Sequence, residues 1–179
     1  MARWTWHVVP DGQAFHVHAM TAAGGSLFAT LSAWRGSIHR SDDSGRTWRM
    51  LYEHPSAPRT VSRFIELQVL NGTVYDGLTA WRDDGPKLFR VQDDSAAPMP
   101  GWPDGRAVTA MVAHRGWLYA MSHADEGSVF LRTDGEKIQR LPGIEGERIR
   151  VLASGDRLWV ATVRSGGGAL HVSEDGIAW

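Results

Sequence analysis

The sequence contains no cysteine, and this absence excludes several classes of protein. Disulfide-stapled scaffolds, cysteine-ligated zinc, iron–sulfur clusters and thiol nucleophiles all depend on that side chain. Long apolar runs are also lacking, because no segment approaches the roughly 18 residues that cross a membrane. The opening residues, MARWTWHVVPDG, lack the apolar core of a signal peptide. We therefore expect a cytoplasmic protein, with secretion left open if the chain is a fragment.

An excess of charge of either sign is missing as well. Lysine and arginine together number 19, and aspartate and glutamate number 20, so the formal net charge is −1. Proteins that bind duplex nucleic acid usually carry a strong basic excess. We therefore expect neither a nucleic-acid nor a membrane partner. Only Lys87 and Lys137 are lysines, and the many arginines, whose planar fork binds carboxylate and phosphate, suit small anions.

Helical periodicity is absent, because no stretch holds an apolar period of about 3.6 residues for three turns. Instead, four short segments share an apolar–aromatic–small pattern. They lie at 26–29, 73–76, 117–120 and 157–160, and their starting positions are separated by 47, 44 and 40 residues. Each follows a turn signal such as Asn71-Gly72, and apolar runs before and after each segment predict further strands.

These four repeats predict an all-β fold, a β-propeller-type array of four four-stranded antiparallel blades in one domain spanning 1–179. The predicted blades are 10–52, 60–102, 106–142 and 147–179. The fourth strand of the second blade is expected near 97–102. The last blade lacks a fourth strand, and the segment 5–9, which reads like 47–51, is expected to supply it.

One motif links this array to a known group of proteins. The residues Ser41-Asp42-Asp43-Ser44-Gly45-Arg46-Thr47-Trp48 match S-x-D-x-G-x-T-W at all five positions, and a shortened version runs from Ser173 to Trp179. The chain therefore resembles the Asp-box (BNR-repeat) β-propellers, a superfamily that includes sialidases. The resemblance implies that Asp43 and Asp175 hold turns and take no part in chemistry, because such side chains bond their own backbone.

Four blades leave open how the ring closes, because an open ring exposes unpaired strand edges. The chain can be a four-bladed monomer closed by 5–9, half of an eight-bladed ring made by two chains, or a fragment of a larger propeller. Closed symmetry removes the edges, so we favour a homodimer over the four-bladed monomer.

Loops that join the second and third strands, with those that join one blade to the next, share one face of a propeller and usually carry the site. Several arginines there would form a positive funnel for a carboxylate or phosphate, unless each pairs with a nearby acid. The predicted ligand-binding residues are Trp34, Arg35, Arg63, Trp81, Arg82, His123 and Arg164.

A metal is a second, weaker expectation. His16 and His18 are two residues apart, so on a strand they point to one face, and Glu66 lies on the next inner strand. Such a set could hold a divalent metal whose bound water attacks a phosphoester or lactone. The alternative is a pair of hydrogen-bonded strand histidines.

Sialidase activity is not expected, because the family's Arg-Ile-Pro motif is absent. Tyr75 and Tyr119 occupy equivalent strand positions, where we expect their rings to pack in the core. Arg40, Arg90 and Arg132 recur at one position of the third strand, where we expect pairing between blades or exposure to solvent.

Two hypotheses for function follow from these residues. The first is a binding or scaffold module that presents an arginine- and tryptophan-rich face to a small anionic or glycan ligand. The alternative is a hydrolase with its site on the axis of the propeller, acting on phosphoesters or lactones with a metal or on glycosides with paired carboxylates.

Overall fold

The structure is a computed structural model that describes residues 16–33, 35–55, 61–80, 85–105, 107–124, 127–142, 144, 148–164 and 166–179. Those residues form fifteen β-strands and no helix, so the all-β prediction is confirmed. Within this part of the chain there is accordingly no helix that could span a membrane.

The strands form four consecutive antiparallel groups, here called units 1 to 4. Unit 1 holds β1 (His16–Ala23), β2 (Ser26–Ala33), β3 (Ser37–Ser41) and β4 (Arg49–Glu53), and unit 2 holds β5 (Ser62–Leu70), β6 (Thr73–Ala80), β7 (Leu88–Gln92) and β8 (Ser95–Pro98). Unit 3 holds β9 (Ala107–His114), β10 (Trp117–Ala124), β11 (Gly127–Thr133) and β12 (Ile138–Leu141), and unit 4 holds β13 (Arg148–Ser154), β14 (Arg157–Arg164) and β15 (Gly167–Ser173). The segment 5–9, predicted to complete unit 4, lies outside the described residues.

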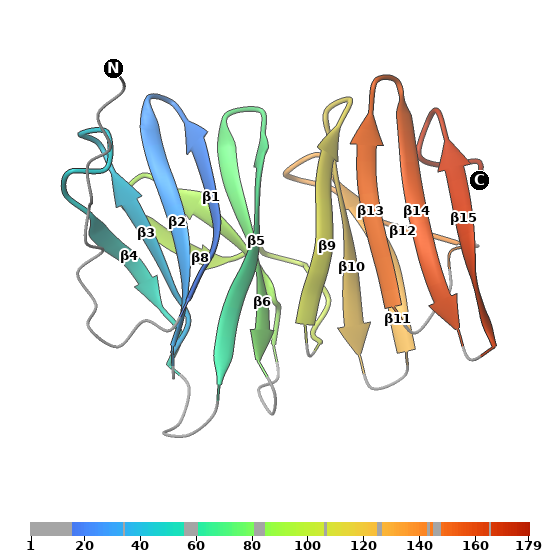
Figure 1. Cartoon of the computed structure of the whole chain (residues 1–179), viewed down its shortest axis with the longest axis horizontal. Coiled ribbons are helices and arrows are strands. Elements are labelled where there is room, and N and C mark those ends of the chain that lie inside the picture. The colour runs from blue at the N-terminus through green and yellow to red at the C-terminus, as the bar shows by residue number, and fades with distance from the viewer. Residues whose placement is uncertain are drawn as a thin grey trace, which may run out of the picture.

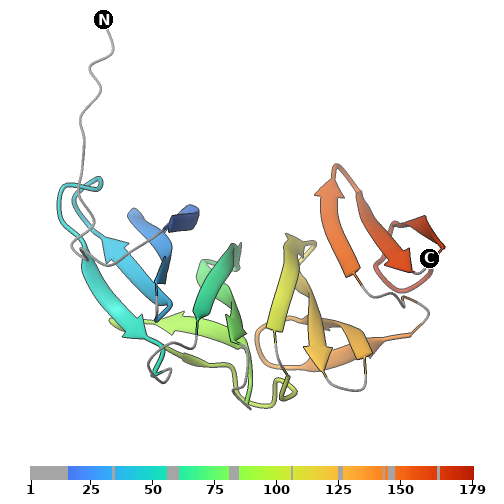
Figure 2. The ribbon, with the colours of Figure 1, turned by 60° about the horizontal axis from the view of Figure 1, so that its bottom comes forward.

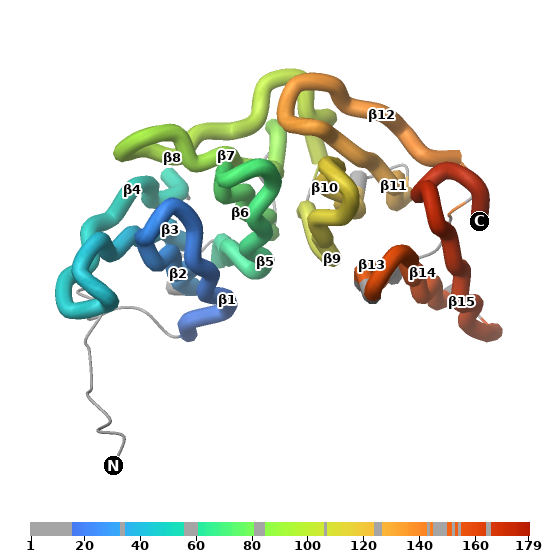
Figure 3. The backbone as a smooth tube through the Cα atoms, turned by 90° about the horizontal axis from the view of Figure 1, so that it is seen from above, coloured from blue at the N-terminus to red at the C-terminus, as the bar shows by residue number. Residues whose placement is uncertain are grey.

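The units stand side by side along an open arc, with unit 1 and unit 4 at its two ends (Figures 1 and 2). Seen from above, the first strand of every unit lies on the concave side of the arc, and β4, β8 and β12 lie on the convex side (Figure 3). The architecture is therefore propeller-type, and β1, β5, β9 and β13 line the side of the axis.

Hairpin turns set the register of each unit. Asn71 and Gly72 join β5 to β6 with φ angles of 49° and 80°, as a type I′ turn requires at both central positions. Arg115 and Gly116 repeat this geometry between β9 and β10. The turns that the sequence predicted are thus present.

Three apolar clusters hold the arc together, one at each junction between consecutive units. The first joins Phe28 and Ile38 of unit 1 to Phe64, Leu78 and Phe89 of unit 2. Equivalent clusters join unit 2 to unit 3 and unit 3 to unit 4. Burial of each such side chain contributes about 1.5–3 kcal/mol, so the junctions are the core of the protein.

Both tyrosines at the equivalent strand positions belong to these clusters. Tyr75 is 2% exposed and Tyr119 1% exposed, so the prediction that their rings pack in the core is confirmed. The fourth strand of unit 2 was predicted too late in the sequence. It ends at Pro98, and Pro100, which has no amide donor, is followed by a turn that carries the buried Trp102.

The third-strand arginines connect neighbouring units. Arg40 donates from Nη1 to the carbonyl oxygen of Asp93 at 3.1 Å. Arg90 donates in the same way to Gly135 at 3.3 Å, and Arg132 to Asp175 at 3.4 Å. The prediction that these arginines pair between blades is confirmed.

The turn from Ser41 to Trp48 closes on its own backbone. Asp43 accepts hydrogen bonds from the amide and hydroxyl of Thr47, at 2.8 and 2.7 Å, and from the hydroxyl of Ser41 at 2.8 Å. These bonds hold the pKa of Asp43 down to about 2. Asp175 accepts the amides of Ile177 and Ala178 in the shortened turn.

Candidate functional site

Arg150 on β13 lies within electrostatic range of two polar side chains from other units, Glu66 on β5 and His123 on β10. The charge of Arg150 lowers the pKa of both Glu66 and His123. Figure 3 shows β5 and β13 on the concave side of the arc, with β10 directly behind β9. The guanidinium of Arg150 therefore acts electrostatically on a carboxyl and an imidazole of two other units.

A β-bulge places Glu66. The pairing of β5 with β6 jumps from Phe64 opposite Leu78 to Glu66 opposite Gly77, which leaves Ile65 as the extra residue. Bulges bend a strand and re-aim the side chains beside them. Gly77 cannot carry a side chain, because a Cβ there would lie 2.7 Å from the carbonyl oxygen of Val108. The bulge and this close approach bring Glu66 up to unit 3.

Burial is the main influence on the protonation of Glu66. The residue is partly buried, and burial raises its pKa although Arg150 lowers it. A carboxyl with a raised pKa retains its proton at higher pH than an ordinary glutamate. Glu66 is thus suited to donate a proton to a bound molecule.

His123 is fixed through both ring nitrogens. Nε2 lies 3.3 Å from Oγ1 of Thr109, and Nδ1 lies 2.8 Å from Oγ of Ser128. Burial and the charge of Arg150 lower its pKa, so the ring is neutral at pH 7. The assignment of His123 to a binding site stays a prediction, and the structure adds that Arg150 acts on its ring electrostatically.

Sequence reasoning missed Asp76, which is 0% exposed on β6. The repeat pattern holds the clue, because Ala29, Ala120 and Val160 stand at this position in the other three units. Neither carboxylate oxygen meets a donor at hydrogen-bonding geometry among the described residues. Burial raises the pKa of Asp76 well above its ordinary value, the nearby amides of Gly77 and Glu66 offset part of this, and the charge of Glu66 adds to it.

The predicted metal ligands do not come together. Within the described ranges, no group of three or more His, Cys, Asp or Glu is placed to hold a metal ion. His18 is itself the bulged residue of β1, and its Nε2 bonds Oγ of Ser32. Burial, His16 and Arg63 lower the pKa of His18. His18 thus matches the alternative of a hydrogen-bonded strand histidine, and its ring centroid lies 5.8 Å from that of His16.

The predicted anion-binding residues are only partly described. Arg35 is exposed and donates to Glu53 at 3.2 Å, which is the local pairing that the sequence left as the alternative. Arg63 is exposed on the concave strand β5. Arg164 ends β14, with its side chain outside the description. Trp34, Trp81 and Arg82 lie outside the described residues. Arg63 and His123 are thus the two members that the structure places near the concave strands.

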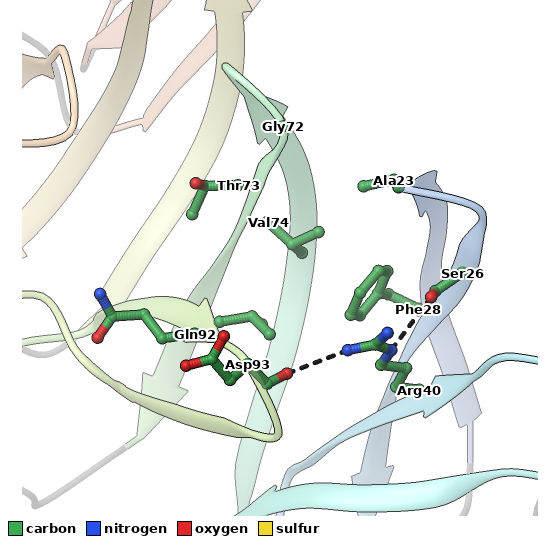
Figure 4. A pocket seen from close by; sticks show the side chains of 11 residues that line it. Ala23, Ser26, Phe28, Arg40, Gly72, Thr73, Val74, Gln92 and Asp93 are labelled. Atoms are coloured by element: carbon green, nitrogen blue, oxygen red, sulfur yellow. Dashed lines mark hydrogen bonds between the residues drawn. The ribbon is translucent and has the colours of Figure 1, made fainter.

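A separate hollow of about 500 Å³ lies between unit 1 and unit 2 (Figure 4). Phe28, Val74 and Val91 are among its apolar lining residues. Arg40 reaches its edge but donates to Ser26, Asp42 and the carbonyl of Asp93. The hollow is therefore part of the seam between unit 1 and unit 2, and the guanidinium of Arg40 is engaged in holding that seam.

Comparison with known proteins gives the fold. No protein-family model matches the chain, and neither does any curated protein. Among solved structures, it is similar to an α-L-arabinofuranosidase from Fusarium graminearum in complex with an iminosugar inhibitor, with 13% identity and a TM-score of 0.50 over 94% of this chain and 64% of that one. A Penicillium chrysogenum α-L-arabinanase complexed with arabinobiose matches with 15% identity and a TM-score of 0.37, over 87% and 62% of the two chains. The chain thus spans less than two thirds of either structure, and its fold is all-β and propeller-type.

Proposed function

We propose that the concave face binds a glycan and hydrolyses a glycosidic bond, with Glu66 as the proton donor. The observation that carries the proposal is the position of Glu66, a partly buried carboxyl with a raised pKa on an axis-lining strand, within electrostatic range of Arg150. Glycoside hydrolysis needs a carboxylic acid that stays protonated near neutral pH to protonate the leaving oxygen.

The neighbours of Glu66 suit a polyhydroxylated ligand. Arg150 and Arg63 offer cationic donors for sugar hydroxyls, while both ring nitrogens of His123 are already engaged with Thr109 and Ser128. In the described part of β1, β5, β9 and β13, Glu66 is the only acidic residue. The second carboxylate of a hydrolase would therefore come from outside these four strands. Asp76 on β6 does not supply it, because its side chain is fully buried and does not reach a bound sugar.

The scaffold fits an Asp-box propeller. The bonds of Asp43 and Asp175 within their own turns support this part of the proposal. The similar Fusarium structure is an arabinofuranosidase, which makes arabinofuranosides a first choice of substrate to test.

The second candidate is binding of an acidic glycan without hydrolysis. Arg63 and Arg150 favour it, because neither forms an ion pair with another described residue. A uronic or sialic acid would then place its carboxylate against these guanidinium groups.

A panel of 4-nitrophenyl glycosides that includes the α-L-arabinofuranoside tests the proposal. We expect release of nitrophenol by the wild type and a loss of at least about 100-fold in kcat for Glu66→Gln, the usual cost of removing a general acid. Glu53→Gln, an exposed carboxylate on β4, is the matched control and should retain activity. Binding without turnover, unaffected by Glu66→Gln, would support the second candidate and refute hydrolysis.

A further inference from the structure

The exposed apolar side chains gather at the two ends of the arc. Six large apolar residues are exposed by half or more in the described part of the chain, and five lie on end surfaces. Val17, Met20 and Met50 lie on unit 1 and form the leading face. Val163 and Leu170 lie on unit 4 and form the trailing face. The sixth, Ile177, lies in the turn that follows β15.

The pairing of the strands shows that the leading face of unit 1 is equivalent to a surface that is buried in unit 2. Met20 stands opposite Ala29 on β2, and in unit 2 the same place in the ladder is taken by Leu67 opposite Asp76. Leu67 packs into the cluster between units 1 and 2 and is 7% exposed, whereas Met20 is 57% exposed. Unit 1 therefore carries the kind of surface that receives a preceding unit, and in the described part of the chain this surface is exposed.

The trailing face of unit 4 is likewise equivalent to a surface that is buried in unit 2. Leu170 stands opposite Ala161 on β14, and Leu88 of unit 2 takes that place opposite Gly77 on β6. Leu88 is fully buried in the cluster between units 2 and 3, whereas Leu170 is 64% exposed. Unit 4 therefore carries the surface that receives a following unit.

We infer that a second copy of this chain covers both faces, with the leading face of each copy against the trailing face of the other. Every internal junction joins a trailing face to a leading face, so the two free faces are complementary to each other. One further copy supplies both at once, and a two-fold arrangement closes the ring with neither face exposed. The partner's concave strands would then complete the enclosure of the axis.

The chemistry of this interface differs from the internal junctions in one respect. In units 1 to 3, Arg40, Arg90 and Arg132 each donate to a backbone carbonyl of the next unit. Val172 takes this position in unit 4, so it supplies no such arginine bond to the partner. The contact therefore depends on apolar burial, which salt does not screen.

Light scattering after size exclusion tests the inference without reference to any activity. We expect a mass of twice 19.8 kDa, unchanged in high salt. Met20→Lys and Leu170→Asp should each halve the mass, and since both side chains are exposed the circular dichroism and melting of the monomer should stay cooperative. Ile177→Lys, an equally exposed apolar residue in the turn that follows β15, is the control and should leave the mass doubled.

Two further outcomes decide the arrangement. Met20→Lys combined with Leu170→Asp in one chain should restore the doubled mass, because the new charges meet only if unit 1 contacts unit 4 of the partner. A mass of 19.8 kDa for the wild type across a dilution series would overturn the inference. A doubled mass that neither single variant alters, or a ladder of growing open assemblies, would overturn it as well.

Discussion

Asp76 stands directly opposite Leu67 in the ladder of β5 and β6, and its other neighbour in register is Phe89 on β7. Cross-strand partners point to the same face of a sheet, so this carboxyl lies among the apolar side chains that join unit 1 to unit 2. No donor among the described residues meets this carboxyl at hydrogen-bonding geometry, and the nearby amides of Gly77 and Glu66 offset the cost of its burial only in part. The other units avoid that cost with Ala29, Ala120 and Val160.

Asp76→Ala should therefore stabilise the protein. Removing this enclosed carboxyl should raise the free energy of unfolding by about 1–3 kcal/mol, and each kcal/mol corresponds to roughly 2–4 °C of melting temperature in a chain of this size. The folded pKa of Asp76 is raised, so its contribution is least unfavourable in acid and worsens as pH rises above the unfolded pKa. The gain from the alanine should accordingly grow from pH 4 to pH 7.

Ala120→Asp is the matched control for this prediction. It places the same carboxyl at the equivalent, fully buried position of unit 3, and it should lower the melting temperature. Thermal melts of both variants across that pH range check the pair. A lower melting temperature for Asp76→Ala would show that Asp76 has a stabilising partner.

Arg150 should control the pH dependence of the candidate site. Its charge lowers the pKa of Glu66, so Arg150→Gln should raise that pKa further. If protonated Glu66 donates the proton, the alkaline limb of the pH–rate profile then moves to higher pH. Carbon-detected NMR titration of the glutamate carboxyls gives the same answer without any substrate. A limb or titration that moves to lower pH would contradict the assignment.

Asp43 should stabilise its turn only while it is ionised. Its folded pKa is lowered to about 2, so its stabilising effect is complete above the unfolded pKa near 4 and is lost as pH falls through about 2. Asp43→Asn should lower the melting temperature at pH 7, and the difference from wild type should shrink in acid. Asp156→Asn, an exposed carboxylate outside the box turns, should change the melting temperature little at either pH. An equal effect of the two substitutions would argue against a role in the turn.

The repeats, the hairpin turns and the buried tyrosines were predictable because each depends on local pattern. Asn71-Gly72 specifies its turn from two residues, and Tyr75 and Tyr119 follow the spacing of the units. The site was not predictable in this way, because Glu66, His123 and Arg150 are brought together by the curvature of three units. The spacing of His16 and His18 suggested neighbouring rings, which lie 5.8 Å apart, but no third ligand joins them among the described residues.

Arg90 should contribute to stability by joining unit 2 to unit 3. It donates to the carbonyl of Gly135 at 3.3 Å and also hydrogen-bonds the hydroxyl of the buried Tyr75, so its loss leaves two acceptors in the seam without this donor. Arg90→Met keeps the apolar stem and removes the donors, and should cost about 1–3 kcal/mol in urea unfolding. Arg49→Met, which breaks exposed ion pairs to Asp42 and Asp94, should cost little by comparison. If the two variants unfold at the same urea concentration, the hydrogen bond from Arg90 to unit 3 does not hold the units together, and the apolar clusters alone account for the arc.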